Sequence, residues 1–323
     1  MITLYELHWS HYCEKIRWAL DYKKLPWKKV NINAFTKQEM KKFPCVRQRY
    51  LVPFIFDEKT KEAIGDSSPI LQYLEKTYSE SPALFPKDRA QREAVYECLI
   101  ELDSKLAVIA RRLGYTQIIL EKPAILAKLF LSDLGGGFFR LPGIRTISSA
   151  FLGMMLIKRF HFDLNESLYL YEELENYLLK IAENLKIKKF LINDTFSAAD
   201  LTLAVYLRPL NIIPFFKEHP NLSGLFEWQE NLFREHNREG KLLYEKLIEQ
   251  HRKTHSPVRR KIRDNLKQPE FLNRIQKEIK KNKIAFNDHE SIWTWGFLKV
   301  PYYYFFKIKK NKVRQKYASE NVR

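Results

Sequence analysis

The chain has 323 residues, of which 45% are hydrophobic and 14% aromatic, and it carries a formal net charge of +18. This length and composition predict two compact domains plus an appended segment, and they exclude wholesale disorder. The three cysteines, Cys13, Cys45 and Cys98, are too few and too scattered for a disulfide framework or a zinc site, so we expect a reducing, cytoplasmic location. The sequence predicts neither a secretory signal nor a membrane span, because it has no basic start followed by an apolar run and no apolar run of about 18 residues.

The positive charge is concentrated at one end of the chain. Residues 251–323 contain 20 lysines and arginines against 6 acidic residues, whereas residues 1–250 contain 36 against 32. The body of the protein is therefore nearly balanced in charge. The C-terminal segment needs an explanation of its own.

The first predicted elements are a strand over residues 2–7 and a helix that follows a Ser-x-x-Cys turn. Ser10 and Cys13 form this turn, and apolar residues then recur at helical spacing between charged ones such as Arg17 and Lys23. A strand, turn and helix in this order place a hydroxyl or thiol at the positive end of a helix. There, the helix dipole and free N–H groups stabilise a thiolate.

Two further patterns follow downstream. Residues 51–56 predict a short buried strand entered through the bond before Pro53, where a cis peptide can be held. Residues 63–74 predict a strand, a Gly-Asp turn and a helix capped by Ser67 or Ser68.

In their order and spacing, these three segments resemble the N-terminal domain of the glutathione transferase superfamily. The resemblance implies a glutathione transferase fold. Its first part is an α/β thioredoxin-like domain with a mixed four-stranded sheet at residues 1–78, and its second is an all-α helical-bundle domain at residues 89–253. The Pro- and Ser-containing residues 79–88 fit the linker between the two. Residues 254–323 form an extension that the resemblance does not cover.

The second half of the chain shows helical periodicity from residue 89 onward. Within it, Ser197 can cap a helix while Asp200, three residues later, accepts a hydrogen bond from the Ser197 N–H. This run looks like the buried capping box of the transferase C-terminal domain, so we assign it to folding and not to chemistry. Further helices are expected near residues 124–134, 147–160, 164–185, 198–207, 222–233 and 242–248.

The resemblance also assigns roles to residues at one end of the predicted sheet. Ser10 occupies the position of the family's activating serine or cysteine, and its hydroxyl would stabilise the thiolate of glutathione, because a free thiol has a pKa of about 8.5. Val52-Pro53 matches the step whose backbone pairs with the cysteinyl part of glutathione. Asp66 and Ser67 match the pair that binds the γ-glutamyl end. Glutathione is thereby implied as a co-substrate, with no metal or other cofactor.

Plain structural roles remain open for the same residues. Ser10 can be an ordinary N-cap, and Asp66-Ser67 is a turn and a cap in either case. His11 can donate to the glutathione sulfur or to a carboxylate, or it can simply begin the helix. Cys13 can act as a single redox thiol or pack inertly against the sheet. It cannot form a disulfide across the motif, because Ser10 replaces the first cysteine.

The resemblance further implies that the first helices of the all-α half line a pocket for the second substrate. The residues expected near it are Arg111, Tyr115, Phe138, Phe139 and Met154. An apolar wall of this kind suits a small hydrophobic electrophile, although such stripes also build ordinary cores.

Three hypotheses about function follow. The first is a glutathione transferase-like enzyme, a homodimer by the resemblance, in which the activated thiol attacks a hydrophobic electrophile or a peroxide. The second is a glutathione-dependent thiol transferase or reductase that uses Cys13. The third is a non-catalytic protein of the same fold, tethered by its C-terminal extension. The family's Asn-Pro-x-Gly pattern is missing ahead of Pro53, which keeps the third hypothesis open.

The C-terminal extension combines basic and aromatic residues. Residues 292–306 contain two tryptophans and three consecutive tyrosines, and lysines follow at once. This composition is typical of a segment that lies on an anionic membrane surface, which would make the protein peripheral. It also fits single-stranded nucleic acid, which we favour least, and an extension that packs on the body of the protein or on another protein.

Overall fold

The structure is a computed structural model that describes residues 1–33, 38–41, 43, 52–121, 124–130, 143–144, 147, 164–192 and 194–253. The N-terminal part is built on a four-stranded sheet in the order β2-β1-β3-β4. The strands are β1 (Ile2–Glu6), β2 (Trp27–Asn31), β3 (Phe54–Asp57) and β4 (Glu62–Gly65). In this sheet β1 pairs with β2 in parallel, while the β1–β3 and β3–β4 pairs are antiparallel. The predicted mixed four-stranded sheet is confirmed.

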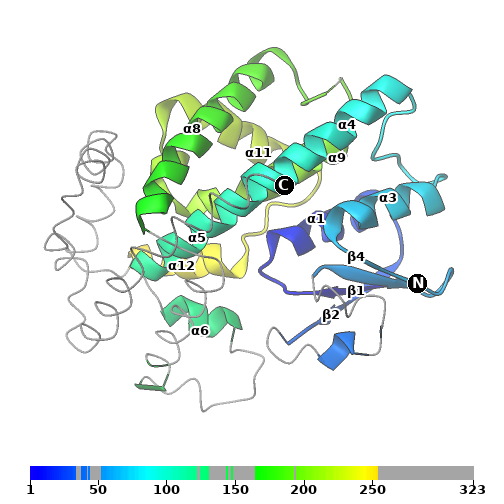
Figure 1. Ribbon diagram of the computed structural model, residues 1–323, viewed down its shortest axis with the longest axis horizontal. Helices are drawn as coiled ribbons and strands as arrows, with labels where there is room; N and C mark the ends of the chain where they lie inside the picture. Colours follow the sequence, from blue (N-terminus) through cyan, green and yellow to red (C-terminus); the bar gives the residue numbers. More distant parts are fainter. Residues whose placement is uncertain are drawn as a thin grey trace, which may run out of the picture.

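Two helices lie between this sheet and the helical half of the molecule, α1 (His11–Tyr22) and α3 (Ser67–Thr77) (Figure 1). Because α1 joins two parallel strands, it crosses one face of the sheet, and its other side packs on α9 (Ala198–Tyr206). A helix covered on both sides buries its polar residues as well as its apolar ones. Lys23, the C-cap residue of α1, is likewise buried and pairs with Glu75 of α3.

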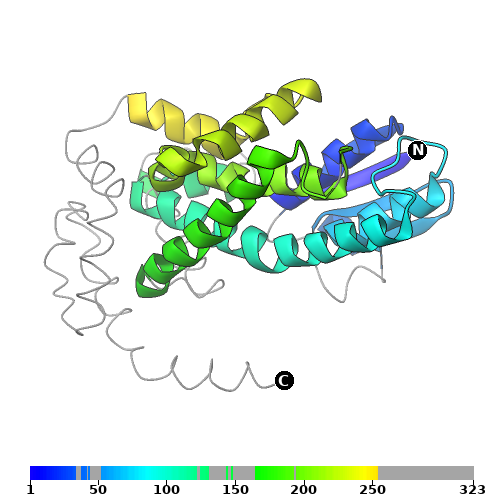
Figure 2. The same cartoon turned by 90° about the horizontal axis from the view of Figure 1, so that it is seen from above.

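The helical half consists mainly of long helices (Figure 2). Figure 1 shows α4 beside α3, and α5 continuing α4 through a short π-helical turn. The α-helices here are α4 (Arg89–Glu101), α5 (Ala107–Glu121), α6 (Ala124–Phe130), α8 (Leu164–Ile187), α9, α10 (Pro214–Lys217), α11 (Ser223–Glu235) and α12 (Leu243–Lys253). The shorter turns of the chain are η1 (Gln38–Met40), the π-helical η2 (Leu102–Leu106), η4 (Arg208–Ile212) and η5 (Pro220–Leu222).

The predicted capping box is present at the start of α9. The Ser197 hydroxyl accepts from the N–H of Ala199, and the Asp200 carboxylate accepts from the N–H of Ser197 at 2.9 Å. The other carboxylate oxygen of Asp200 accepts from the N–H of Leu191 at 2.8 Å. This fully buried carboxylate therefore ties the preceding loop to the helix, which is a folding role.

One apolar core runs through both halves of the molecule. Trp18 of α1 lies at their junction, with its ring centroid 5.8 Å from that of Phe196 and 5.4 Å from that of Phe233. The sheet domain and the helical half are thus held together by one shared set of apolar contacts. No helix in the described ranges is both long and apolar enough to cross a bilayer. All but the first residue of the helix predicted near residues 147–160, and the extension at residues 254–323, lie outside the described residues.

Candidate functional site

The sheet brings the predicted site segments to one edge. Tyr5, near the end of β1, lies opposite Phe54, the first residue of β3, and Phe54 in turn lies opposite Gly65, the last residue of β4. The turn after β1, the start of β3 and the end of β4 therefore meet at the same edge. The N–H of Asp66 donates to the carbonyl of Pro53 at 3.1 Å, which joins two of these segments directly.

The peptide bond between Val52 and Pro53 is cis, as the sequence analysis anticipated. This step stands immediately before β3, where the backbone is not yet part of a strand. Pro53 is buried and Val52 is half-buried.

Ser10 is the N-cap residue of α1, and its backbone carbonyl accepts from the N–H of Glu14 at 3.0 Å. Its side chain makes no capping hydrogen bond to the helix. An ordinary N-cap serine uses its hydroxyl to satisfy one of the first helical N–H groups. The hydroxyl of Ser10 is thus placed at the positive end of α1 without the contact that a purely structural cap would make.

Asp66 is the N-cap of α3, which corrects the expectation that Ser67 or Ser68 caps this helix. The Asp66 carboxylate accepts from the N–H of Ser67 at 2.7 Å. The backbone of Asp66 has a φ of 74°, a region that residues other than glycine seldom adopt. Ser67 begins the helix proper and is buried, and its hydroxyl makes no hydrogen bond of normal geometry within the described residues.

Residues 4–82 match the sequence family described as "Glutathione S-transferase, N-terminal domain". The N-terminal domain belongs to the glutathione transferase superfamily. The match contains the segments that carry Ser10, the cis Pro53 step and the Asp66-Ser67 pair. No curated protein sequence matches the chain.

Solved structures extend the likeness to the helical half. The β-etherase LigF from Sphingobium has a TM-score of 0.56 and 18% identity, and the match covers 74% of this chain and 99% of that one. Rice GST1 in complex with glutathione has a TM-score of 0.52 and 16% identity, covering 77% and 95%. Glutathione S-transferase unclassified 2 from Bombyx mori has a TM-score of 0.51 and 16% identity, covering 77% and 97%. The chain therefore has the glutathione transferase fold, as its sequence predicts.

Within this fold, Cys13 has the environment of an inert thiol. It is completely buried, and its sulfur accepts from the N–H of Leu7 at 3.4 Å. Burial, reinforced by the carboxylate of Glu6, raises the pKa of the Cys13 thiol to about 12. A hydrogen bond from the Ser10 hydroxyl lowers this pKa only in part. Because the thiolate is the reactive form of cysteine, this environment favours the packing role over redox chemistry.

His11 also has the environment of a core residue. Its ring lies 4.2 Å from that of Tyr12 and 5.3 Å from that of Tyr206 on α9. Burial, together with the charges of Arg111 and Lys15, lowers the pKa of His11 to about 3, so the ring is neutral under physiological conditions. The structure thus gives His11 a buried packing position between the two domains, which corrects the alternative of a residue that simply begins the helix and which offers no charged contact with a ligand.

Helix α5 places a mixed aromatic and cationic wall beside the start of α1. The Arg111 guanidinium lies 5.6 Å from the ring centroid of Tyr12. Phe130 of α6 lies 5.1 Å from Trp9 and 6.1 Å from Tyr115, centroid to centroid. Arg111 and Tyr115 therefore lie close to the Ser10 turn, and their role toward a second substrate stays a prediction. Phe138, Phe139 and Met154 lie outside the described residues.

Sequence reasoning missed a buried polar cluster behind the start of α3. It consists of Lys15, Ser68, Asp103 and Tyr206, which we call the Lys15 cluster. One signal for it was available, because Lys15 stands three residues after Tyr12 and four before Ala19 and so lies on the packed stripe of α1.

Proposed function

We propose that this protein binds glutathione at the edge of the sheet and that Ser10 stabilises its thiolate. The observation that carries the proposal is the position of the Ser10 hydroxyl at the N-terminus of α1. It contacts the Cys13 sulfur instead of capping the helix, and its turn lies at the same edge of the sheet as the cis Pro53 step and the Asp66 cap. A neutral hydroxyl that donates to sulfur favours the charged form of the thiol, and the helix dipole acts in the same direction. The superfamily match of residues 4–82 supports glutathione as the ligand.

The activated sulfur would then attack an electrophilic carbon or a peroxide. In the first case a carbon–sulfur bond forms and a leaving group departs. In the second, a sulfur–oxygen bond forms as the O–O bond breaks, which releases an alcohol, and a second glutathione then converts the sulfenic acid into glutathione disulfide and water. The aromatic wall of Trp9, Tyr115 and Phe130 supports a small hydrophobic electrophile as the second substrate. The burial and raised pKa of Cys13 weigh against the thiol transferase hypothesis. Measurable turnover would separate the enzyme from a non-catalytic protein of the same fold.

Asp66 provides the direct test of glutathione binding. Asp66→Asn keeps the capping oxygen and removes the negative charge that would face the α-ammonium of the ligand. We expect the dissociation constant for glutathione, measured by calorimetry, to rise about tenfold, since a charge-assisted hydrogen bond is lost. Glu62→Gln, at the opposite end of β4, is the control and should leave binding unchanged. No binding by the wild-type protein, or equal binding by the Asp66 variant, would contradict the proposal.

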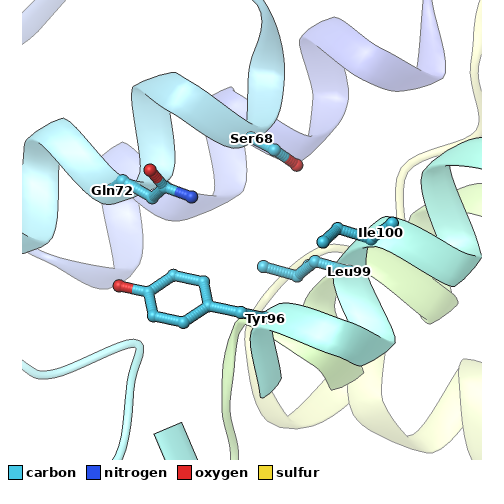
Figure 3. Close-up of a pocket in the computed structure, with 5 residues that line it drawn as sticks. All are labelled: Ser68, Gln72, Tyr96, Leu99 and Ile100. Carbon is cyan, nitrogen blue, oxygen red and sulfur yellow. The ribbon is translucent and has the colours of Figure 1, made fainter. Parts of the chain in front are cut away.

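We further propose that the protein is a homodimer that associates through α3 and α4. A pocket of about 230 Å³ opens between these helices, lined by Ser68, Gln72, Tyr96, Leu99 and Ile100. Figure 3 shows the two α3 side chains facing the three from α4. Ile100 is a large apolar side chain that is 68% exposed, and it lies beside Tyr96 and Leu99, which fits a surface that a second copy covers.

The dimer proposal predicts that Ile100→Asp yields a monomer. Placing a charge in an apolar contact should raise the dimer dissociation constant at least about tenfold, since burying one such side chain is worth about 1.5–3 kcal/mol. Light scattering across a concentration series measures this change. Ile187→Asp, at another exposed isoleucine on α8, is the control and should leave the dimer intact. A monomeric wild-type protein would refute the proposed association.

A further inference from the structure

A lysine ammonium is completely enclosed behind the first turn of α3. Lys15 is 0% exposed, and its Nζ donates to the Ser68 hydroxyl at 2.9 Å, to the Asp103 carboxylate at 3.1 Å and to the Tyr206 hydroxyl at 3.3 Å. An ammonium has three N–H donors, so each one has an acceptor here. An unpaired charge would be very unfavourable at such a site, which means that Lys15 is bound in a specific geometry.

The acceptors come from both halves of the molecule. Lys15 and Ser68 belong to the sheet domain, whereas Asp103 lies in the π-helical turn η2 and Tyr206 at the end of α9. The Ser68 hydroxyl donates to one oxygen of the Asp103 carboxylate, and the Tyr206 hydroxyl donates to the other. The Lys15 cluster therefore binds the first turn of α3 to the helical domain through three different elements.

This first turn is the one that presents Asp66 and Ser67. Ser68 follows Ser67 directly, so a bond that fixes Ser68 also fixes the backbone N–H groups at the start of α3. Figure 3 shows Ser68 on the side of α3 that faces α4. The Lys15 ammonium also interacts favourably with the Asp66 carboxylate.

We propose that Lys15 is a positioning residue for the ligand-binding end of α3. It does not touch the ligand but holds the first turn of α3, and with it Asp66 and Ser67, in the conformation that accepts an α-amino acid group. The identity of that group as the γ-glutamyl end of glutathione rests on the function proposed above, whereas the positioning itself does not.

The test compares Lys15→Met with Lys23→Met in the full-length protein. Lys23 is an equally buried lysine at the other end of α1, and its Nζ donates to Glu75 near the end of α3 at 2.9 Å and to the Pro82 carbonyl at 3.1 Å. Both variants remove a paired, buried charge and should lower the melting temperature. Only the Lys15 variant should loosen the start of α3.

Two readouts separate positioning from stability. In Lys15→Met, amide hydrogen exchange over residues 67–71 should accelerate at least tenfold relative to Lys23→Met. The KM for glutathione should rise about tenfold with kcat changed less than twofold, because uniform binding is lost while the chemistry is untouched. Tyr206→Phe removes a single hydroxyl of the cluster and should show the same effects more weakly if Lys15→Met folds poorly.

The outcomes distinguish this inference from the proposed function. Unchanged exchange over residues 67–71 in Lys15→Met and Tyr206→Phe would overturn the positioning role, whatever the protein binds. If the wild-type protein binds glutathione and Lys15→Met has the same KM for it, that result would overturn the positioning role as well. Accelerated exchange in a protein that never binds glutathione would support the positioning role and refute glutathione as the ligand.

Discussion

Replacing Ser10 with alanine is expected to lower kcat/KM for glutathione conjugation about 10- to 100-fold near neutral pH. A hydrogen bond to a charged group is worth about 1.5–3 kcal/mol, and 1.36 kcal/mol corresponds to one pKa unit. Without the hydroxyl, the pKa of the bound thiol should therefore rise by about one to two units, toward the value of about 8.5 for a free thiol. Thiolate absorbance of the glutathione complex, followed against pH, measures this shift.

The sign of the pH dependence follows from the same shift. Below the pKa of the bound thiol in the wild-type protein, the rate of each protein falls in proportion to its own thiolate fraction, so the difference between the two is largest. Above the raised pKa of the variant, both proteins hold glutathione as the thiolate. The two activities should therefore converge as the pH increases. An activity ratio that stays constant with pH would argue against a role for Ser10 in ionising the thiol.

Two controls make the Ser10 result specific. Because the Ser10 hydroxyl contacts the Cys13 sulfur but makes no capping hydrogen bond, Ser10→Ala should lose only that bond to sulfur and not the roughly 1 kcal/mol of stability that loss of an N-cap usually costs. Cys13→Ala should change kcat/KM by less than about threefold, since the Cys13 thiol is buried with a pKa raised to about 12. Activity that depends on Cys13 and not on Ser10 would replace the transferase proposal with the thiol transferase one. Chlorodinitrobenzene is a suitable electrophile for both assays.

Local patterns explain why much of the fold was predictable. The strand, turn and helix at the start of the chain, the cis step before Pro53 and the capping box of Ser197 and Asp200 each depend on residues close together in sequence. Their order carried the resemblance to the glutathione transferase superfamily, and that resemblance implied a mixed sheet followed by a helical domain. The position of Ser10 at the mouth of α1 follows from the same local signals.

Errors arose where tertiary contacts decide the environment. The sequence showed Lys23 only as one of the charged residues between apolar ones and gave Lys15 no role, but both lysines are enclosed by other parts of the fold. The partners of Lys15 stand 53, 88 and 191 positions away in sequence, so no local pattern could reveal them. The cap of α3 was misplaced by one or two residues, because a positive φ at Asp66 is set by the turn after β4. The burial of His11 likewise depends on helices from the other domain.

The largest effect on stability is expected for Arg208→Met. Arg208 of η4 is 3% exposed and joins α1 to α12 through the carboxylates of Glu14 and Glu245, at 3.9 and 3.2 Å. Its guanidinium also donates to the carbonyls of Gly240 and Arg238, both at 3.0 Å. Methionine fills similar space but leaves these acceptors without their cation. Breaking a buried ion pair from one side costs about 3–5 kcal/mol, so we expect the free energy of unfolding to fall by that amount.

Urea unfolding measures this loss, and Arg89→Met provides the control. Arg89 pairs with Glu93 one turn along α4, but both side chains are largely exposed, and such surface pairs contribute about 0–1 kcal/mol.

Burial alone would raise the pKa of Glu14, but Arg17 and Arg208 bring it below its usual value. Ionised Glu14 therefore stabilises the folded protein above the pKa of an ordinary glutamate, and this contribution disappears as the pH falls through the depressed pKa. Arg208→Met should accordingly destabilise most at neutral pH and less in acid, whereas an equal loss at both pH values would show that packing, and not charge, holds α1 against α12.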